Sequence, residues 1–276
     1  MAGTSDRSLS GVAETLLITL YIRAMESRRP DALIKDEKAM ALVAQMEADF
    51  SKIRQIKMDE DDKVSILLRN REFDTKVKEF LVRCPEATVV HIGCGLDARF
   101  ERVDNGRVEW YDLDLPEVTE LRRKFIGGES ERYHYLGYSA FDPAWLDTPG
   151  LQRARPLLCL AEGVFMYFEE AQIKALVLRL QERFPGAELV FDAFSQYIVR
   201  MNNLRFALTK YSARYHWGLR HAKDLEGWGN GICLLDTWFP FDRPEPRLAR
   251  IWWMRYIPLF AKVLGIYHYR LGGPGE

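Results

Sequence analysis

The stretch that decides the fold reads Thr88-Val-Val-His-Ile-Gly-Cys-Gly-Leu-Asp-Ala-Arg99. Its first five residues form a short apolar run, which predicts a buried strand. Gly93 and Gly95 follow and predict a tight turn in which the backbone can approach a ligand closely. This is half of the Gly-x-Gly-x-x-Gly pattern of dinucleotide-binding loops, because Ala98 stands where the third glycine would be. Alone, the turn fits a nucleotide-like ligand or simply a bend that needs two glycines.

Apolar runs and helix-like stretches alternate along the chain after this strand. Further strands are expected at 108–113, 133–136, 157–160 and 188–191, with two more near the end at 232–239 and 265–270. Helical spacing is found at Pro116–Ile126 and Glu169–Phe184. Strands that alternate with helices indicate βαβ units and a parallel sheet covered on both faces, so we expect an α/β fold.

The first 80 residues carry apolar side chains at helical spacing, over 14–25, 36–50 and 61–82. No linker separates them from the alternating region. We therefore expect a helical N-terminal extension (1–85) packed on one α/β domain (86–276). A substrate lid is expected at about 195–230, and the whole chain forms a single structural unit.

Composition excludes several classes of function. The 276 residues include 39 Lys and Arg against 40 Asp and Glu, a net charge of -1, which argues against a nucleic-acid partner. The cysteines stand far apart, at Cys84, Cys94, Cys159 and Cys233, which argues against a metal site and fits a reduced, cytoplasmic setting. The apolar stretches Leu16–Ile22 and Ile251–Tyr269 are short or interrupted by charges, so no membrane span is expected.

Acidic residues follow the expected strands at the edge where a parallel sheet binds ligands. Asp112 and Asp114 end the second strand, 17 and 19 residues beyond Gly95, where an acid can hold a ribose. Glu162 leaves the fourth, apolar strand, where an unpaired carboxylate is costly to bury and calls for a cation. A glycine turn with two such acids favours a positively charged adenosine cofactor, S-adenosylmethionine, over a dinucleotide whose pyrophosphate is anionic.

Three segments carry a resemblance to a known family: Val89–Arg99, Tyr111–Val118 and Ala161–Tyr167. They closely resemble the leucine carboxyl methyltransferase family, which includes the tetracenomycin-type polyketide O-methyltransferases. The resemblance covers about residues 12–195. It implies a Rossmann-like class I methyltransferase with a seven-stranded, mostly parallel sheet whose last strands are antiparallel. It also implies S-adenosylmethionine as cofactor and S-adenosylhomocysteine as product.

Two N-terminal segments extend the resemblance. Arg23-Ala-Met-Glu-Ser-Arg-Arg-Pro-Asp31, with Asp36 and Ala39 after it, looks like the family's opening motif. Arg69-Asn-Arg-Glu-Phe-Asp74 is similar to its arginine-rich helix. The resemblance implies that Arg71 of this helix grips the methionine carboxylate of the cofactor and that Glu162 lies near the methionine ammonium.

The resemblance also implies the remaining cofactor contacts. Gly93 and Gly95 would lie against the cofactor, with Asp114 on the ribose. In place of the family's usual acid near the adenine, the chain has Gly137-Tyr-Ser-Ala-Phe-Asp142, so either Ser139 or Asp142 holds the adenine amine. The other expected contacts are Asp97, Asp112, Leu115, Ala140, Phe141, Gly163 and Tyr167.

The acceptor site is expected in the aromatic and basic stretch Tyr211–His221, as a helical lid over a flat substrate. Arg214 or Arg220 would meet a substrate carboxylate, although the same stretch also fits a partly buried helix with solvated arginines. The candidate catalytic residues are Tyr215, His216 and His221, whereas His134 lies within a strand pattern and is expected to be structural.

The sequence therefore predicts an S-adenosylmethionine-dependent O-methyltransferase acting on a carboxylate or hydroxyl of a small, aromatic or polyketide-like metabolite. A protein carboxyl methyltransferase and a non-catalytic adenosyl-ligand-binding protein are the alternatives. A nicotinamide-dependent oxidoreductase is disfavoured because the glycine loop lacks its third glycine. The protein is expected to be a monomer or a homodimer.

Overall fold

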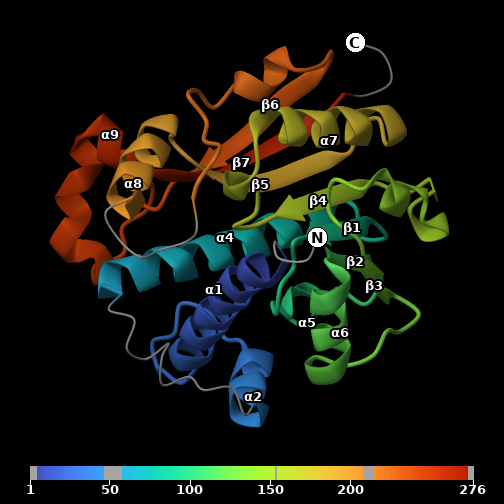
Figure 1. Ribbon diagram of the computed structural model, residues 1–276, viewed down its shortest axis with the longest axis horizontal. Helices are drawn as coiled ribbons and strands as arrows, with labels where there is room; N and C mark the ends of the chain where they lie inside the picture. The colour runs from blue at the N-terminus through green and yellow to red at the C-terminus, as the bar shows by residue number, and fades with distance from the viewer. Residues whose placement is uncertain (1–4, 47–57, 153, 208–213, 273–276) are drawn as a thin grey trace.

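A seven-stranded sheet lies at the centre of the computed structural model, which describes residues 5–46, 58–152, 154–207 and 214–272 (Figure 1). Its strands are β1 (Thr88–Ile92), β2 (Glu109–Asp114), β3 (Tyr133–Gly137), β4 (Leu157–Ala161), β5 (Glu188–Phe194), β6 (Ile232–Trp238) and β7 (Leu264–Leu271). The order across the sheet is β3-β2-β1-β4-β5-β7-β6. Strands β1 to β5 pair in parallel, and β7 is antiparallel to β5 and β6. The expected class I methyltransferase sheet is confirmed.

The strand order reverses between β1 and β4, because β2 and β3 extend the sheet in one direction and β4 and β5 in the other. Ile92, at the end of β1, pairs with Leu113 of β2 and with Ala161 of β4. The loops that leave these three strands therefore begin side by side at one edge, which is where open parallel sheets bind ligands.

Helices cover both faces of the sheet because successive strand residues point to opposite sides. Ile92 shares a hydrophobic cluster with side chains of α7 (Glu170–Arg183), whereas Val89 shares one with side chains of α4 (Glu60–Arg83). Figure 1 shows α7 and α4 on opposite sides of the strands. All five residues of β1 are buried, as its continuous apolar pattern predicts for a strand covered on both faces.

Two N-terminal helices, α1 (Ser5–Ser27) and α2 (Glu37–Gln45), pack against the loop that follows β1. Leu20, Leu42 and Leu96 are buried together in one hydrophobic cluster. Within the described part of the chain, no helix combines the length and the apolar content needed to cross a membrane.

The remaining helices are short or peripheral. They are α5 (Arg99–Val103), α6 (Pro116–Phe125), α8 (Gln196–Ala207) and α9 (Pro258–Ala261), with 3-10 helices η1 (Pro143–Asp147), η2 (Pro149–Gln152), η3 (Phe165–Tyr167), η4 (Asp224–Gly227) and η5 (Pro246–Tyr256).

The helical cover expected over 211–221 is wrong for residues 214–221, and the other three residues lie outside the described ranges. Residues 214–218 belong to neither a helix nor a strand, and Leu219 forms a bridge with Ser195, directly after β5. Trp217 and Leu219 are both buried in the core. Two buried side chains two residues apart suit an extended backbone rather than a helix. Any lid in this part of the chain is therefore not a helix over 214–221.

Candidate functional site

The turn after β1 can be formed only with glycine at two positions. Gly93 and Gly95 have φ angles of 64° and 52°, a region that L side chains rarely adopt. A Cβ on Gly93 would lie 2.5 Å from Val164, and one on Gly95 would lie 2.4 Å from Leu16 of α1. The turn is therefore enclosed between the loop after β4 and the N-terminal helix.

Asp114 ties the end of β2 to this glycine loop. Its carboxylate accepts hydrogen bonds from the amides of Gly95 and Leu115, each at 2.8 Å. Burial raises the pKa of Asp114, although these amides oppose the shift. The carboxylate thus lies at the strand edge beside the loop, where the sequence analysis expected a ribose-binding acid.

Asp112, two residues earlier, is already fully engaged by the protein. It accepts hydrogen bonds from Arg122, from the Tyr133 hydroxyl at 2.5 Å and from the Trp110 indole at 2.8 Å. Its side chain is buried. Asp112 thus connects α6 and β3 to β2, which favours Asp114 as the candidate for the ribose.

Glu162, after β4, is held by side chains of the protein itself. Arg69 Nε and Arg99 Nη2 lie 2.9 and 2.6 Å from its two carboxylate oxygens, and Asn70 Nδ2 donates a further hydrogen bond. Burial would raise the pKa of Glu162, but Arg99 and Arg69 outweigh it and lower that pKa. Arg69 and Arg99 are therefore the cations that a buried carboxylate at this position requires.

Asp192, in β5, completes this cluster. It accepts hydrogen bonds from Arg69 Nη1 at 2.9 Å and from the Gly163 amide at 2.6 Å. Burial raises its pKa, against the effect of Arg69. Asp192 was not predicted as a site residue. It could have been found by the same pattern as Glu162, because both are acids that follow an apolar strand run in the sequence.

The arginine beside Glu162 is Arg69, two residues before Arg71, for which the resemblance implied a contact with the methionine carboxylate. Arg71 is exposed and lines a groove with Lys38 and Lys78. Two residues on a helix are about 200° apart, so only one of these arginines can point at the strand ends. Arg69 also lies against Gly163, with Nη2 3.6 Å from where a Cβ on that glycine would be.

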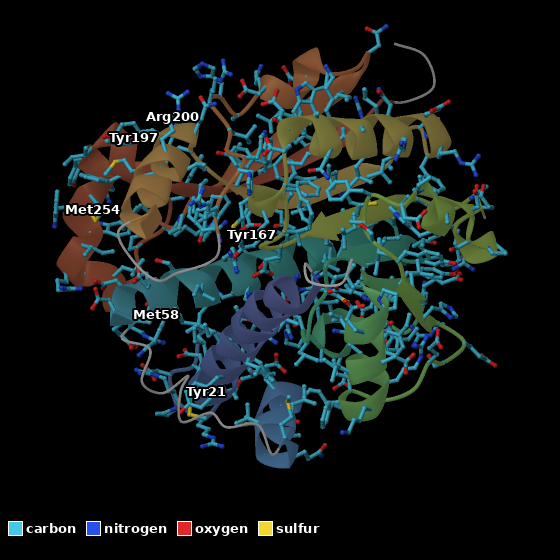
Figure 2. The ribbon with its side chains drawn as sticks, viewed as in Figure 1. Tyr21, Met58, Tyr167, Tyr197, Arg200 and Met254 are labelled. Carbon is cyan, nitrogen blue, oxygen red and sulfur yellow. The ribbon has the colours of Figure 1, made fainter. Side chains whose placement is uncertain are left out.

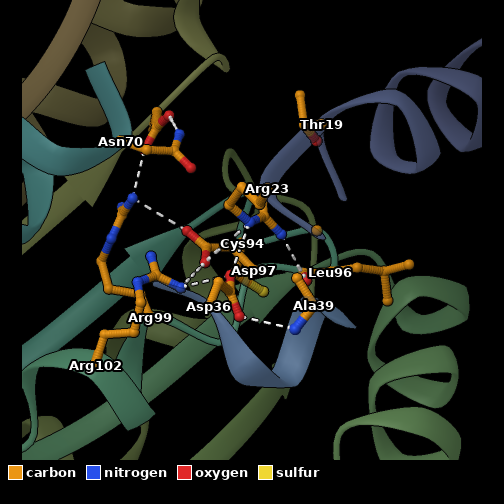
Figure 3. Close-up of polar contacts among 12 residues, drawn as sticks. Thr19, Arg23, Asp36, Ala39, Asn70, Cys94, Leu96, Asp97, Arg99 and Arg102 are labelled. Carbon is orange, nitrogen blue, oxygen red and sulfur yellow. Dashed lines mark hydrogen bonds and ion pairs between the residues drawn. The ribbon is translucent and has the colours of Figure 1, made fainter. Parts of the chain in front are cut away.

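Asp97, another expected cofactor contact, is held by arginines of the protein. Its carboxylate lies 2.8 Å from Arg102 and 3.1 Å from Arg99, as part of the ionic cluster drawn in Figure 3. Burial opposes ionisation of Asp97, but Arg102 and Arg99 hold its pKa well below the usual value. The negative charge of Asp97 is therefore neutralised by neighbouring arginines.

The adenine side of the site contains short polar contacts. Ser139 and Asp142 are both exposed after β3. Asp142 accepts a hydrogen bond from the Ala144 amide at 2.9 Å and so caps η1, and Ser139 Oγ lies 3.3 Å from the Phe141 amide. Phe141 packs edge-on against Phe168 with ring centroids 4.5 Å apart. Either polar side chain remains available, so the two alternatives for the adenine amine both stand.

Aromatic side chains gather where β4 and β5 end. Tyr215 lies 5.6 Å from Tyr167 and 4.9 Å from Phe194, measured between ring centroids. In Figure 2, Tyr167 lies near the centre of the molecule, between α4 and α8. Burial raises the pKa of Tyr167, which keeps this hydroxyl protonated. These rings, tilted by 55° and 32° against one another, form an aromatic wall near Arg69.

His216 follows Tyr215 and is paired with a carboxylate. Its backbone amide donates to the Met166 carbonyl at 2.8 Å, and its Nδ1 lies 2.9 Å from Glu169 Oε1. His221 is exposed, and its backbone amide donates to Asp224 Oδ2 at 3.0 Å. Of the two candidate bases, His216 is thus the one with an orienting partner next to the aromatic wall. His134 stacks on Tyr111 with centroids 4.7 Å apart, as suits a structural residue.

The residues present fit a cofactor that carries an amine and a carboxylate. Among the buried side-chain atoms of the described residues, Asn70 Oδ1 and Arg99 Nη1 have no hydrogen-bond partner. Both side chains contact Glu162. One is an acceptor suited to an ammonium and the other a donor suited to a carboxylate. With the glycine turn and Asp114, they match the methionine and ribose parts of S-adenosylmethionine.

Comparison with known proteins agrees with this geometry. The family model described as leucine carboxyl methyltransferase matches residues 16–181. The chain belongs to the leucine carboxyl methyltransferase family. It is 35% identical over 237 residues to the tetracenomycin polyketide synthesis O-methyltransferase TcmP of Streptomyces glaucescens, with 86% of each chain covered. It is also 28% identical to the S-adenosyl-L-methionine-dependent methyltransferase dpfgK of Gibberella zeae, over 90% of this chain and 88% of that one.

Solved structures agree on the fold. A DUF574 family protein from Streptomyces avermitilis superposes with a TM-score of 0.60 at 16% identity, covering 93% of this chain and 96% of that one. A candidate methyltransferase from Thermobifida fusca gives 0.59 at 14% identity, over 91% and 94% of the two chains. As a member of the leucine carboxyl methyltransferase family, the protein is an enzyme that uses S-adenosylmethionine to transfer methyl groups.

Proposed function

We propose that this methyltransferase acts on an oxygen atom of a small aromatic or polyketide-like metabolite. The observation that carries the proposal is the wall of Tyr167, Tyr215 and Phe194 at the ends of β4 and β5. Aromatic side chains favour aromatic ligands through stacked and edge-on contacts. The relative TcmP, which is an O-methyltransferase of polyketide synthesis, supports the same substrate class.

The cofactor would be held from three strand ends. Gly93 and Gly95 would lie against it, and Asp114 would accept hydrogen bonds from the ribose hydroxyls. Arg69 would meet the methionine carboxylate together with Arg99 Nη1, and Asn70 Oδ1 would accept a hydrogen bond from the methionine ammonium. We assign Glu162 a share in orienting Arg69, because its oxygens already accept from that side chain, Asn70 and Arg99. Leu115, Ala140, Phe141 and Gly163 line the same edge in our proposal, with Ser139 or Asp142 at the adenine.

The chemistry that the cofactor supplies is an electrophilic methyl group on a sulfonium, displaced in line by the acceptor oxygen. The protein's own contribution is to hold that oxygen in contact with the methyl carbon, which by itself provides a large share of the rate. A carboxylate acceptor is ionised at neutral pH and needs no base. A phenol or alcohol needs one, and we assign this role to His216, because Glu169 engages Nδ1 and leaves Nε2 for the substrate.

The direct test is an activity screen with isotopically labelled S-adenosylmethionine against small aromatic acids and phenols. We expect label in the small-molecule fraction; release of that label as methanol by mild base identifies an ester, and its retention identifies an ether. Label found on added protein instead would replace the proposal with a protein carboxyl methyltransferase. Cofactor binding by calorimetry without turnover on any acceptor would replace it with a ligand-binding role.

A further inference from the structure

The opening motif of the chain has no part in methyl transfer as described so far, yet some of its charged residues are buried. Arg23, on α1, is 3% exposed, and Asp36, at the start of α2, is 2% exposed. Burying an ion pair is costly unless its geometry is well satisfied. The contacts of these two side chains, drawn in Figure 3, show what they hold together.

Arg23 connects the N-terminal helices to the cofactor loop. Its Nε donates to Asp36 Oδ2 at 2.9 Å, and its Nη2 donates to the Leu96 carbonyl at 3.0 Å, across 73 residues of sequence. Leu96 directly follows Gly95, so the guanidinium fixes the backbone of the turn on which the cofactor is expected to lie. A planar guanidinium is suited to bridging two acceptors in this way.

Asp36 extends the connection to α2 and α5. Its Oδ1 accepts from the Ala39 amide at 2.8 Å, which fixes the start of α2. Its Oδ2 also accepts from Arg102 of α5 at 2.9 Å, and Arg102 in turn lies 2.8 Å from Asp97 in the loop. Arg23, Asp36 and Arg102 therefore form an N-terminal clamp on the loop after β1.

The opposite side of the loop is held by a second buried arginine. Arg122 of α6 donates to the carbonyls of Gly95 at 2.6 Å and Asp97 at 2.9 Å. Three successive carbonyl groups, at 95, 96 and 97, thus each accept from a buried arginine, and the middle one depends on α1. Leu16 of α1 also packs onto Gly95, 2.4 Å from where a Cβ would lie.

We propose that Arg23 and Asp36 are positioning residues of the cofactor site, and that α1 docks on the loop in a manner coupled to cofactor binding. Arg23 acts through the Leu96 carbonyl and touches neither the cofactor nor the acceptor. Because coupling between two events is reciprocal, a docked α1 favours the binding conformation of the loop, and bound cofactor favours docking of α1. The inference rests on the loop as cofactor site and is independent of the acceptor class.

The first test compares Arg23→Gln with Arg28→Gln by titration calorimetry with S-adenosylhomocysteine. Arg28 is an exposed arginine directly after the end of α1, and it serves as the matched control. We expect at least tenfold weaker binding for Arg23→Gln and unchanged binding for Arg28→Gln. Arg23→Lys should bind more tightly than Arg23→Gln, because it keeps a positive charge beside Asp36. The kcat at saturating cofactor should stay within about twofold of wild type, so that the loss lies in the KM for cofactor.

Thermal unfolding of each variant separates positioning from general stability. If Arg23→Gln lowers the melting temperature but binds S-adenosylhomocysteine like wild type well below that temperature, Arg23 is merely structural and the proposal is overturned. If no variant and not even wild type binds the ligand, the cofactor site itself is misassigned, which is a different failure.

Hydrogen exchange supplies a second readout that needs no variant. S-adenosylhomocysteine should slow amide exchange in α1 over residues 16–27 as well as in the loop, and leave β6 unchanged because β6 lies at the far edge of the sheet. In Arg23→Gln the protection of the loop should persist in part while that of α1 is lost. Protection of the loop alone in the wild type would refute the coupling.

Discussion

Two arginines of one helix give the sharpest test of the cofactor site. Arg69 contacts Glu162 and Asp192, each at 2.9 Å, while Arg71 is exposed on the other side of α4. We expect Arg69→Lys and Arg69→Gln to weaken cofactor binding, and Arg71→Gln to leave it unchanged. The same charge is removed in Arg69→Gln and in Arg71→Gln, two residues apart, so a general electrostatic effect would appear in both.

The magnitude follows from the bond that is lost. A hydrogen bond to a charged group contributes about 1.5–3 kcal/mol, and each 1.4 kcal/mol is tenfold in affinity, so Arg69→Gln should raise the dissociation constant roughly 10- to 150-fold. Arg69→Gln also leaves Asp192, which is 0% exposed, without its ion pair. Loss of one partner of a buried pair costs about 3–5 kcal/mol of stability. Arg69→Lys keeps a cation beside Asp192 and should therefore lose less stability than Arg69→Gln.

The assay is titration calorimetry with S-adenosylmethionine and S-adenosylhomocysteine, after circular dichroism has shown that each variant is folded. Arg69→Lys should bind less tightly than wild type because an ammonium cannot bridge Glu162 and Asp192 as a guanidinium does. Wild-type affinity in both Arg69 variants, or an equal loss in Arg71→Gln, would refute the assignment of Arg69 to the methionine carboxylate.

Three further outcomes are expected. Asp112→Asn should lower the free energy of unfolding in urea by roughly 3 kcal/mol, because a buried arginine loses its counter-charge, while cofactor affinity of the folded protein stays unchanged; a lost affinity at full stability would return Asp112 to the ligand site. Burial alone would raise the pKa of Glu188, but hydrogen bonds from Arg83 and His268 outweigh it and lower that pKa to about 2. Because the pKa is lowered on folding, this stability is present above the unfolded value of 4.5 and is lost as pH falls from there toward 2. Glu188→Gln should reduce the slope of the unfolding free energy against pH over that window. An unaltered slope would exclude Glu188 as the source of this pH dependence. His216→Asn should lower kcat on phenolic acceptors about 100-fold and leave carboxylate acceptors nearly unaffected, measured by product formation at saturating cofactor; equal losses on both would argue against a base.

The sheet could be predicted because its strands are buried on both faces. A strand covered on both sides is a nearly continuous apolar run, and β1 is found at Thr88–Ile92, the residues expected. The turn after β1 and the acid after β2 were predictable for a second reason. The topology of a parallel sheet brings its strand ends together at one edge.

The pairing of charges could not be predicted. The sequence shows Arg69 and Arg71 in one helix, and only the rotation of α4 against the sheet decides which of them faces Glu162. Asp112 and Asp114 point to the same side of β2, and the buried Arg122 from α6 decides that Asp112 is structural. Such choices depend on elements that are distant in sequence.

The stretch over 214–221 was misread for a different reason. It was expected to be a helical cover because it is aromatic and basic and follows the fifth strand, whereas Trp217 and Leu219 are buried in the main core beside β5. Burial of these two side chains outweighs the local preference for a helix, as tertiary packing often does.

The position of β7 has a consequence for how the chain is made. This strand of 8 residues follows the other six strands of the sheet in sequence, yet it lies inside the sheet, between β5 and β6. On the ribosome, the residues of the cofactor loop and of its arginine contacts emerge long before residues 264–271. Until these arrive, β5 presents an open edge of the kind that pairs with other chains. The sheet is therefore completed only when an interior strand is inserted, and a nascent chain that stalls before residue 264 would carry a formed cofactor loop on an aggregation-prone sheet.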